Sequence, residues 1–198
     1  MIMKRLFICV FAIMAFSGQI YAKDAYRDEE IGLSFPLELA GFEFQGHHNY
    51  EKPGLGYSVR YQDDRLFKID IYVYDNTYKD IGDGSSSKRV GDEFNSVLAI
   101  FPYLEKNGKY RNVKELKKGK KKYGTNGVEF LWAQYQYEQS PGKGVQYLGK
   151  RVSNTYLTAK KGKFIKVRLT FKKNELNKRE KDTKEFMKEL SKMLNGSS

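Results

Sequence analysis

The chain is poor in cysteine and histidine, and both shortages limit its chemistry. Cys9 is the only cysteine, and His47 and His48 are the only histidines. With a single thiol the chain cannot form an internal disulfide, and a serine–histidine triad would have to use one of two adjacent imidazoles. Long apolar runs are scarce too: after residue 16 no segment approaches the ~20 apolar residues that a spanning helix needs.

The first 22 residues have the three regions of a secretory signal peptide. Lys4 and Arg5 supply the positive start, residues 6–16 are apolar, and residues 17–22 are small or turn-prone and end in Ala22. We therefore expect cleavage after Ala22 and export to the periplasm or the extracellular space. The alternative is an uncleaved anchor, but the apolar run is short for that role.

Cys9 lies inside the apolar run and not at the expected cleavage point. A lipid-modified N-terminus is therefore not expected, and residues 23–198 would contain no thiol. That length is typical of one domain that is folded by its own apolar core. We expect a single α+β domain over residues 23–198.

Acidic residues are also in deficit. Without the leader, 34 Lys and Arg face 24 Asp and Glu, which leaves a net charge of +10. This charge favours polyanions such as acidic lipid head groups, lipopolysaccharide or wall polymers, although it also serves solubility. Lysine, a hydrated point charge, far outnumbers arginine, the residue of planar phosphate recognition. Nucleic acid is not expected as a partner, because an exported protein seldom meets it.

Alternating apolar and polar residues predict most of the domain to be strand. After a frayed start at residues 23–30, we expect a short hairpin around Gly41, with Pro36 at a sheet edge. A three-residue turn at 63–65 would place Tyr61 near Phe67. The other expected strands are 57–62, 67–74, 128–137, 145–159 and 164–171, with a turn at 140–144.

Two segments have helical spacing. Val90, Phe94 and Phe101 lie on one face of a helix that Ser86 or Ser87 can cap and that Pro102 kinks or ends. A second amphipathic helix runs from about residue 175 or 178 to 194. Its apolar stripe is narrow, so we expect it to dock on the sheet. We expect loops at 46–56, 75–87 and 117–123.

These elements predict an α+β fold: a single antiparallel sheet with an N-terminal hairpin, one central helix and a C-terminal helix packed on it. The order resembles the Mog1/PsbP-like layout, and the chain is similar to uncharacterised exported bacterial proteins of this size. The resemblance is carried by IGLSFPLELAGFEF at 31–44, YSVRY at 57–61, FKIDIYVYD at 67–75 and the final sheet-then-helix. It implies an accessory or partner-binding protein and supplies no catalytic motif.

No metal or cofactor site is expected. Adjacent histidines on a strand point to opposite faces, although in a loop they could converge. Asp75, Asp80 and Asp83 fail the calcium-loop spacing. Asp70, expected to pair with Arg60 across the strands, would be the carboxylate of an alternative reading, a small hydrolase-type enzyme that also uses the histidines.

Two surface features favour binding over catalysis. A lysine cluster occupies the predicted loop, and tyrosines lie on the predicted strands, where they can also form cross-strand pairs. We therefore predict a non-enzymatic exported domain that binds a protein partner or an anionic envelope component. Its candidate ligand-binding residues are Lys117, Lys118, Lys120, Lys121, Lys122, Tyr72 and Tyr74.

Overall fold

The computed structural model describes residues 24–65, 67–139 and 149–196. The predicted leader and the predicted turn at 140–144 lie outside the described residues. The strands are β1 (Asp24–Asp28), β2 (Leu33–Pro36), β3 (Glu38–Leu39), β4 (Phe42–Asn49), β5 (Tyr57–Gln62), β6 (Lys68–Tyr74), β7 (Tyr110–Lys122), β8 (Glu129–Gln139), β9 (Lys150–Lys160) and β10 (Lys163–Lys172). The helices are α1 (Lys88–Leu98), α2 (Ile100–Lys106) and α3 (Leu176–Gly196), with a short 3-10 turn, η1 (Lys173–Glu175), before α3.

The α+β prediction is confirmed. Eight strands form one antiparallel sheet in the order β3-β4-β5-β6-β10-β9-β8-β7. The expected frayed start is wrong, because β1 pairs with β2 in a separate two-stranded sheet. The chain does turn back at Gly41, but there it joins β3 to β4.

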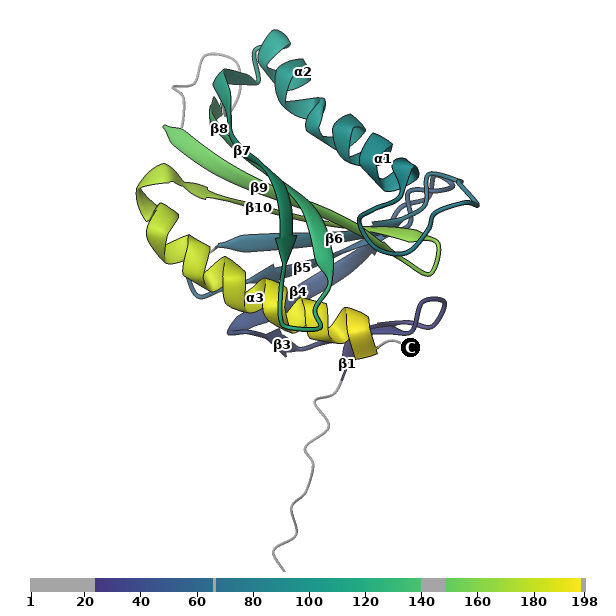
Figure 1. Cartoon of the computed structure of the whole chain (residues 1–198). Helices are drawn as coiled ribbons and strands as arrows, with labels where there is room; N and C mark the ends of the chain where they lie inside the picture. The colour runs from purple at the N-terminus through teal and green to yellow at the C-terminus, as the bar shows by residue number, and fades with distance from the viewer. Residues whose placement is uncertain (1–23, 66, 140–148, 197–198) are drawn as a thin grey trace, which may run out of the picture.

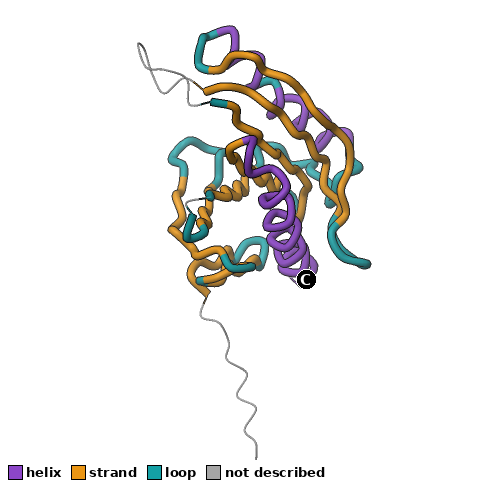
Figure 2. Tube along the Cα trace, turned by 90° about the vertical axis from the view of Figure 1, so that its left-hand side faces the viewer, coloured by secondary structure: helices purple, strands orange, loops and turns teal. Residues whose placement is uncertain are grey.

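Helices cover both faces of the large sheet (Figure 1). The docking prediction for the C-terminal helix is confirmed: Phe186, Met187, Leu190 and Leu194 of α3 are buried in one core cluster with β2, β5, β6 and β10. The α1–α2 pair buries Val90, Phe94 and Phe101 in a second cluster on the other face. Figure 2 shows the sheet curling around α3.

The central helix is divided before Pro102. Ser87 caps α1, because its hydroxyl accepts the Val90 N–H at 3.2 Å. Ala99 separates α1 from α2, and Pro102 is the third residue of α2. The first turn of a helix has no internal partner for its N–H groups, so a proline there removes no hydrogen bond. Pro102 therefore lies in the new helix instead of ending the old one.

The predicted loop at 117–123 is wrong, and the predicted loop at 46–56 is wrong in its first four residues but right over residues 50–56. The segment 117–123, expected to be a basic loop, is for the most part the end of strand β7, where Lys117 to Lys122 pair with β8 without a break. The lysine-rich composition is typical of a loop and so did not indicate a strand. An edge strand, however, is often lysine-rich and does not need apolar residues on each of its faces. The histidines, expected in a loop at 46–56, lie in β4.

The predicted turn at 63–65 is wrong in its register. Tyr61 lies opposite Ile69 and not Phe67. The turn is longer because Asp63 closes it: its backbone N–H donates to the Phe67 carbonyl at 3.1 Å, and its carboxylate accepts the Phe67 N–H at 2.7 Å. A shift of two residues leaves every side chain on its predicted face.

Candidate functional site

The strand conformation of β7 divides the lysine cluster between two faces. Directly opposed residues of antiparallel strands share a face. Lys117 lies opposite Gln134 and Lys121 opposite Phe130, on the face that α3 covers. The opposite face carries Lys118, Lys120 and Lys122, which lie opposite Ala133, Leu131 and Glu129. The five predicted lysines are therefore not one surface.

A cleft of about 520 Å³ lies between β7, the neighbouring strands β8 and β9, and α3. Its rim carries Lys117 and Lys121 from β7, Lys122 from the last position of that strand, and Glu180 and Lys184 from α3. The remaining lining consists of Tyr123, Trp132, Gln134, Asn154, Tyr156 and Thr183. Four lysines and one glutamate thus surround a lining of aromatic rings, amides and hydroxyls.

The amides of the lining have fixed orientations. The Trp132 indole N–H donates to Asn154 Oδ1 at 3.0 Å, and Gln134 Nε2 donates to the same oxygen at 3.1 Å. Because the indole can only donate, Asn154 must present its oxygen to both neighbours. The hydrogen bonds among the described residues then leave the Asn154 NH₂ and the Gln134 carbonyl without a partner. Both polar groups are available to a ligand.

Hydroxyl groups add to this lining. Tyr123 donates to the Tyr156 hydroxyl at 3.2 Å, and burial raises the pKa of both phenols. Thr183 of α3 is 3% exposed, and its buried hydroxyl has no hydrogen-bond partner within the part of the chain that the structure describes. A buried hydroxyl without a partner is costly, so a ligand that bonds to it would gain free energy.

The rim lysines differ from those on the other face of β7. No ion pair of the described residues includes Lys117, Lys121, Lys122 or Lys184. In contrast, Lys118 donates to Asn95 Oδ1 at 3.1 Å, and Lys120 pairs with Glu129 at 2.9 Å. The protein thus uses two of the three lysines on the outer face and leaves those of the rim uncommitted.

Lys121 lies directly over the indole of Trp132, with Nζ 3.5 Å from the ring centroid. Burial lowers the pKa of Lys121; nearby Glu180 opposes this shift, and Lys117 adds to it. A cation on an aromatic face is stabilised by the ring, and more strongly where water is excluded. Lys121 therefore joins the positive rim to the aromatic lining.

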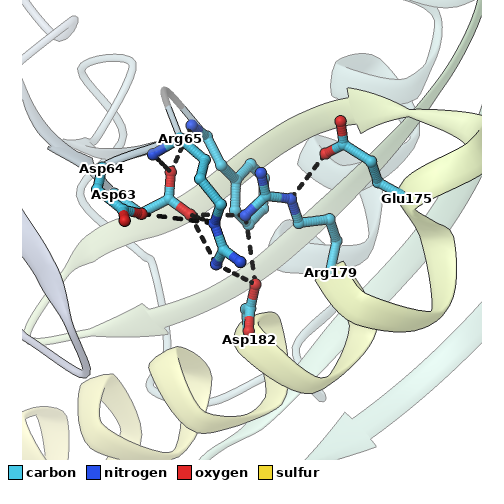
Figure 3. A network of polar contacts seen from close by, with 7 residues as sticks. Asp63, Asp64, Arg65, Glu175, Arg179 and Asp182 are labelled. Atoms are coloured by element: carbon cyan, nitrogen blue, oxygen red, sulfur yellow. Dashed lines mark hydrogen bonds and ion pairs between the residues drawn. The ribbon is translucent and has the colours of Figure 1, made fainter.

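An ion-pair network holds the α3 wall of the cleft in place (Figure 3). Arg179 of α3 lies 2.6 Å from Asp63 in the β5–β6 turn, and both side chains are buried. Arg179 also pairs with Glu175 and Asp182, and its guanidinium stacks on Phe67 at 4.5 Å. Asp63, interpreted from the sequence as turn chemistry, therefore also fixes the first turns of α3.

The predicted tyrosines are not at this cleft. Tyr74 is buried in the core cluster beneath α1, where its hydroxyl donates to Glu93 at 2.6 Å. Burial, followed by the Glu93 contact, raises the pKa of Tyr74. Tyr72 packs against the same cluster, and Lys166 Nζ lies 4.2 Å from its ring. The structure therefore places the tyrosines and the rim lysines on opposite faces of the sheet.

The residues of the alternative hydrolase hypothesis do not come together in one site. His47 lies opposite Val59 and stacks on Tyr26, whereas the adjacent His48 contacts Tyr50 on the other face. Asp70 pairs with Arg60 at 2.6 Å, as predicted. Among the described residues no group of three or more His, Cys, Asp or Glu side chains is arranged to hold a metal ion.

Sequence reasoning missed Trp132, Asn154, Thr183 and above all Gln134 as site residues. One signal was present: Gln134 continues the face of β8 that begins with the buried Phe130 and Trp132, where the pattern calls for another apolar residue. A buried polar residue at such a position needs a partner or a ligand.

None of the helices in the described residues is both long and apolar enough to cross a membrane. No known family model matches the chain, and no curated protein matches its sequence. Among solved structures, the solution structure of cyanobacterial PsbP (CyanoP) from Synechocystis sp. PCC 6803 matches 87% of this chain and 88% of that one, with a TM-score of 0.44 and 12% identity. The resemblance to PsbP is therefore one of layout.

Proposed function

We propose that the chain is an exported, non-enzymatic binding domain whose cleft between β7 and α3 holds an anionic component of the cell envelope. One observation carries the proposal. The lysines that line this cleft form no ion pair among the described residues, whereas Lys118 and Lys120 on the other face of β7 are bound within the protein.

The lining favours a sugar-containing polyanion among the anionic components. Amide and hydroxyl groups offer both donors and acceptors, as a carbohydrate requires. The largely buried rings of Trp132 and Tyr156 form an apolar floor beneath them. Lysine ammonium groups bind anions as point charges without a fixed geometry, which suits a repeating polymer. A concave site fits one segment of such a chain better than the flat surface of a bilayer.

Positive charge along an edge strand also has a simpler explanation. Lysines on an exposed edge prevent sheets from pairing edge to edge, and β7 is the last strand in the sheet order. That role requires positive charge along the strand, and it does not matter which face of the sheet the lysines lie on. It therefore does not account for rim lysines that surround polar groups without partners, and a comparison of the two faces separates the explanations.

The test is a pair of charge-matched variants of residues 23–198. The cleft variant carries Lys117→Gln, Lys121→Gln and Lys184→Gln; the control carries Lys106→Gln, Lys118→Gln and Lys120→Gln, none of which lines the cleft. Binding to dextran sulfate, with uncharged dextran as a second control, is measured by calorimetry at two salt concentrations. We expect the cleft variant to bind at least about tenfold more weakly than the control.

Equal loss in both variants would mean that net charge alone attracts the polymer and would contradict the proposal. Absence of binding to the sulfated polymer would do the same and would favour the second candidate, a protein partner. That candidate is supported by the free edge of β7, on which an extended segment of a partner can add a strand.

Export has an independent test. The leader predicts that the protein recovered from outside the cytoplasm begins at Lys23, which N-terminal sequencing determines directly. Recovery in the cytosol with residues 1–22 intact would contradict export and leave the binding chemistry of the cleft to be judged on its own.

A further inference from the structure

A second group of cations lies on the opposite face of the sheet, beneath the α1–α2 pair. Lys166 and Arg168 are two residues apart on β10, so both project from the same face. Thr155 of β9 lies opposite Arg168. With Val97 of α1 and Ile100 of α2 these residues line a cavity of about 250 Å³.

Neither cation has a carboxylate partner. No ion pair of the described residues includes Lys166 or Arg168. Arg168 makes a neutral contact instead, since its Nη2 donates to the Tyr110 hydroxyl at 3.1 Å. The cavity thus holds two positive charges that form no ion pair with a carboxylate of the described residues.

The nearby carboxylates are committed to other groups. Asp70 lies opposite Arg168 on β6, but its carboxylate accepts from Arg60 at 2.6 Å. Glu93 of α1 accepts from the Tyr74 hydroxyl at 2.6 Å and from the Asn76 amide at 3.0 Å. Both oxygens of Glu93 therefore accept hydrogen bonds, and neither carboxylate forms an ion pair with Lys166 or Arg168 among the described residues, although the charges of both act on Lys166 from a distance.

The environment makes this arrangement costly. Both side chains are only partly exposed, Lys166 lies over the ring of Tyr72, and the Arg168 guanidinium is 5.8 Å from the ring centre of Phe101. Burial, followed by the nearby charge of Arg168, lowers the pKa of Lys166 to about 8. Two like charges held close together away from water are unfavourable unless an anion compensates them.

We infer that the cavity lined by Lys166, Arg168 and Thr155 is a binding site for a small dianionic oxyanion, such as a phosphate group. Two adjacent cations match two negative charges, and the Thr155 hydroxyl is a further donor. The volume exceeds that of several water molecules, each about 30 Å³ in the liquid, so a phosphate with a small substituent fits. This site is separate from the cleft beside α3 and does not depend on the function proposed for it.

The test measures inorganic phosphate binding at pH 7 by calorimetry, with acetate as the singly charged comparison. We expect saturable phosphate binding to the unmodified protein that is at least about tenfold tighter than acetate binding. Lys166→Met should weaken phosphate binding by a similar factor. Lys68→Met, which removes an exposed lysine of β6 outside the cavity, should leave it unchanged.

Two further variants make the result unambiguous. Lys166→Arg keeps the charge and should bind phosphate within about threefold of the unmodified protein, which shows that the site and not the fold was lost in Lys166→Met. The cleft variant with Lys117, Lys121 and Lys184 changed to Gln should bind phosphate normally, which separates this site from the proposed function. No phosphate binding at millimolar concentration, or equal binding by Lys166→Met, would overturn the inference.

Discussion

Two regions of this molecule contain positively charged side chains that are at least partly buried, and the two regions differ in how these charges are paired. Arg179 is 3% exposed and is met by the carboxylates of Asp63, Glu175 and Asp182. Lys166 and Arg168 lie partly buried on the other face of the sheet and form no ion pair with a carboxylate of the described residues. The first arrangement is what a structural ion pair needs, whereas the second leaves charge for a ligand. The comparison therefore separates charges that hold the fold from charges that can bind.

The largest expected effect comes from breaking the paired region. Arg179→Ala should lower the free energy of unfolding by about 3–5 kcal/mol, because it leaves the buried Asp63 carboxylate without its buried partner. Urea unfolding measures the loss. The control is Arg65→Ala, whose 41% exposed side chain pairs with the same aspartate and should contribute less than about 1 kcal/mol. Equal losses in the two variants would contradict the structural role of Arg179.

The same pair predicts an acid dependence. Burial raises the pKa of Asp63, but hydrogen bonds from the Phe67 N–H and from Arg179 outweigh it, and the net pKa is lowered. A lowered folded-state pKa adds stability above the ordinary aspartate value of about 3.9, and that stability is lost as the pH falls through the folded-state value. Asp63→Asn should thus be less stable than the unmodified protein at pH 7 by about 2 kcal/mol. The difference should shrink below pH ~4; a constant difference down to acid unfolding would rule out this linkage.

At Lys166 we expect a change in stability of the opposite sign. Lys166→Met removes a cation that has no counterion, so without added anion the variant should be as stable as the unmodified protein or more stable by about 1 kcal/mol. The groups that face Lys166 are Arg168 on its own strand, Asp70, Tyr72 and Tyr74 on β6, and Glu93 on α1.

This variant also has a pH signature. Because the folded-state pKa of Lys166 is lowered to about 8, the charge costs stability fully below pH 8 and progressively less up to the unfolded value of about 10.4. The advantage of Lys166→Met in thermal unfolding should therefore disappear over that range. A variant that is clearly less stable at neutral pH would show that Lys166 holds the fold as Arg179 does.

The smallest expected effect comes from a change in α1, the helix above the cavity, that leaves the two cations in place. Ser87→Ala removes the cap of α1 and should cost about 1 kcal/mol in urea unfolding. Phosphate affinity should stay within about twofold, since the cap lies outside the lining of the cavity. Loss of phosphate binding in this variant would mean that the site depends on the whole helix more than on its two cations.

Sequence patterns predicted the elements that have strong periodicity. The alternation in 164–171 and the apolar stripe that contains Phe186 and Leu190 identify β10 and α3, because one face of each is buried. The prediction failed for the lysine-rich part of β7. The outer face of this strand is solvated, and its hydrogen-bond partners lie on one side alone. Local composition cannot reveal a strand whose conformation is imposed by a neighbour.

The candidate site was predicted only in part. Lys117, Lys121 and Lys122 line the cleft, but alternation along a strand, which a loop lacks, decides which lysines share a face. The partners from β9 and α3, Asn154 and Thr183, come from segments distant in sequence, so no local pattern could place them. The Arg179–Asp63 pair, 116 residues apart, was missed for the same reason.

Fluorescence of Trp132, the single tryptophan of the chain, tests the proposed binding cleft most directly. Its indole lines the cleft, bonds to Asn154 and lies beneath Lys121. We predict that titration with dextran sulfate changes the Trp132 emission saturably and that uncharged dextran does not. The change should be lost in the cleft variant but kept when Lys106, Lys118 and Lys120, which lie outside the cleft lining, are changed to Gln. Binding of the polymer with no change in Trp132 emission would place the ligand elsewhere on the protein and contradict the account.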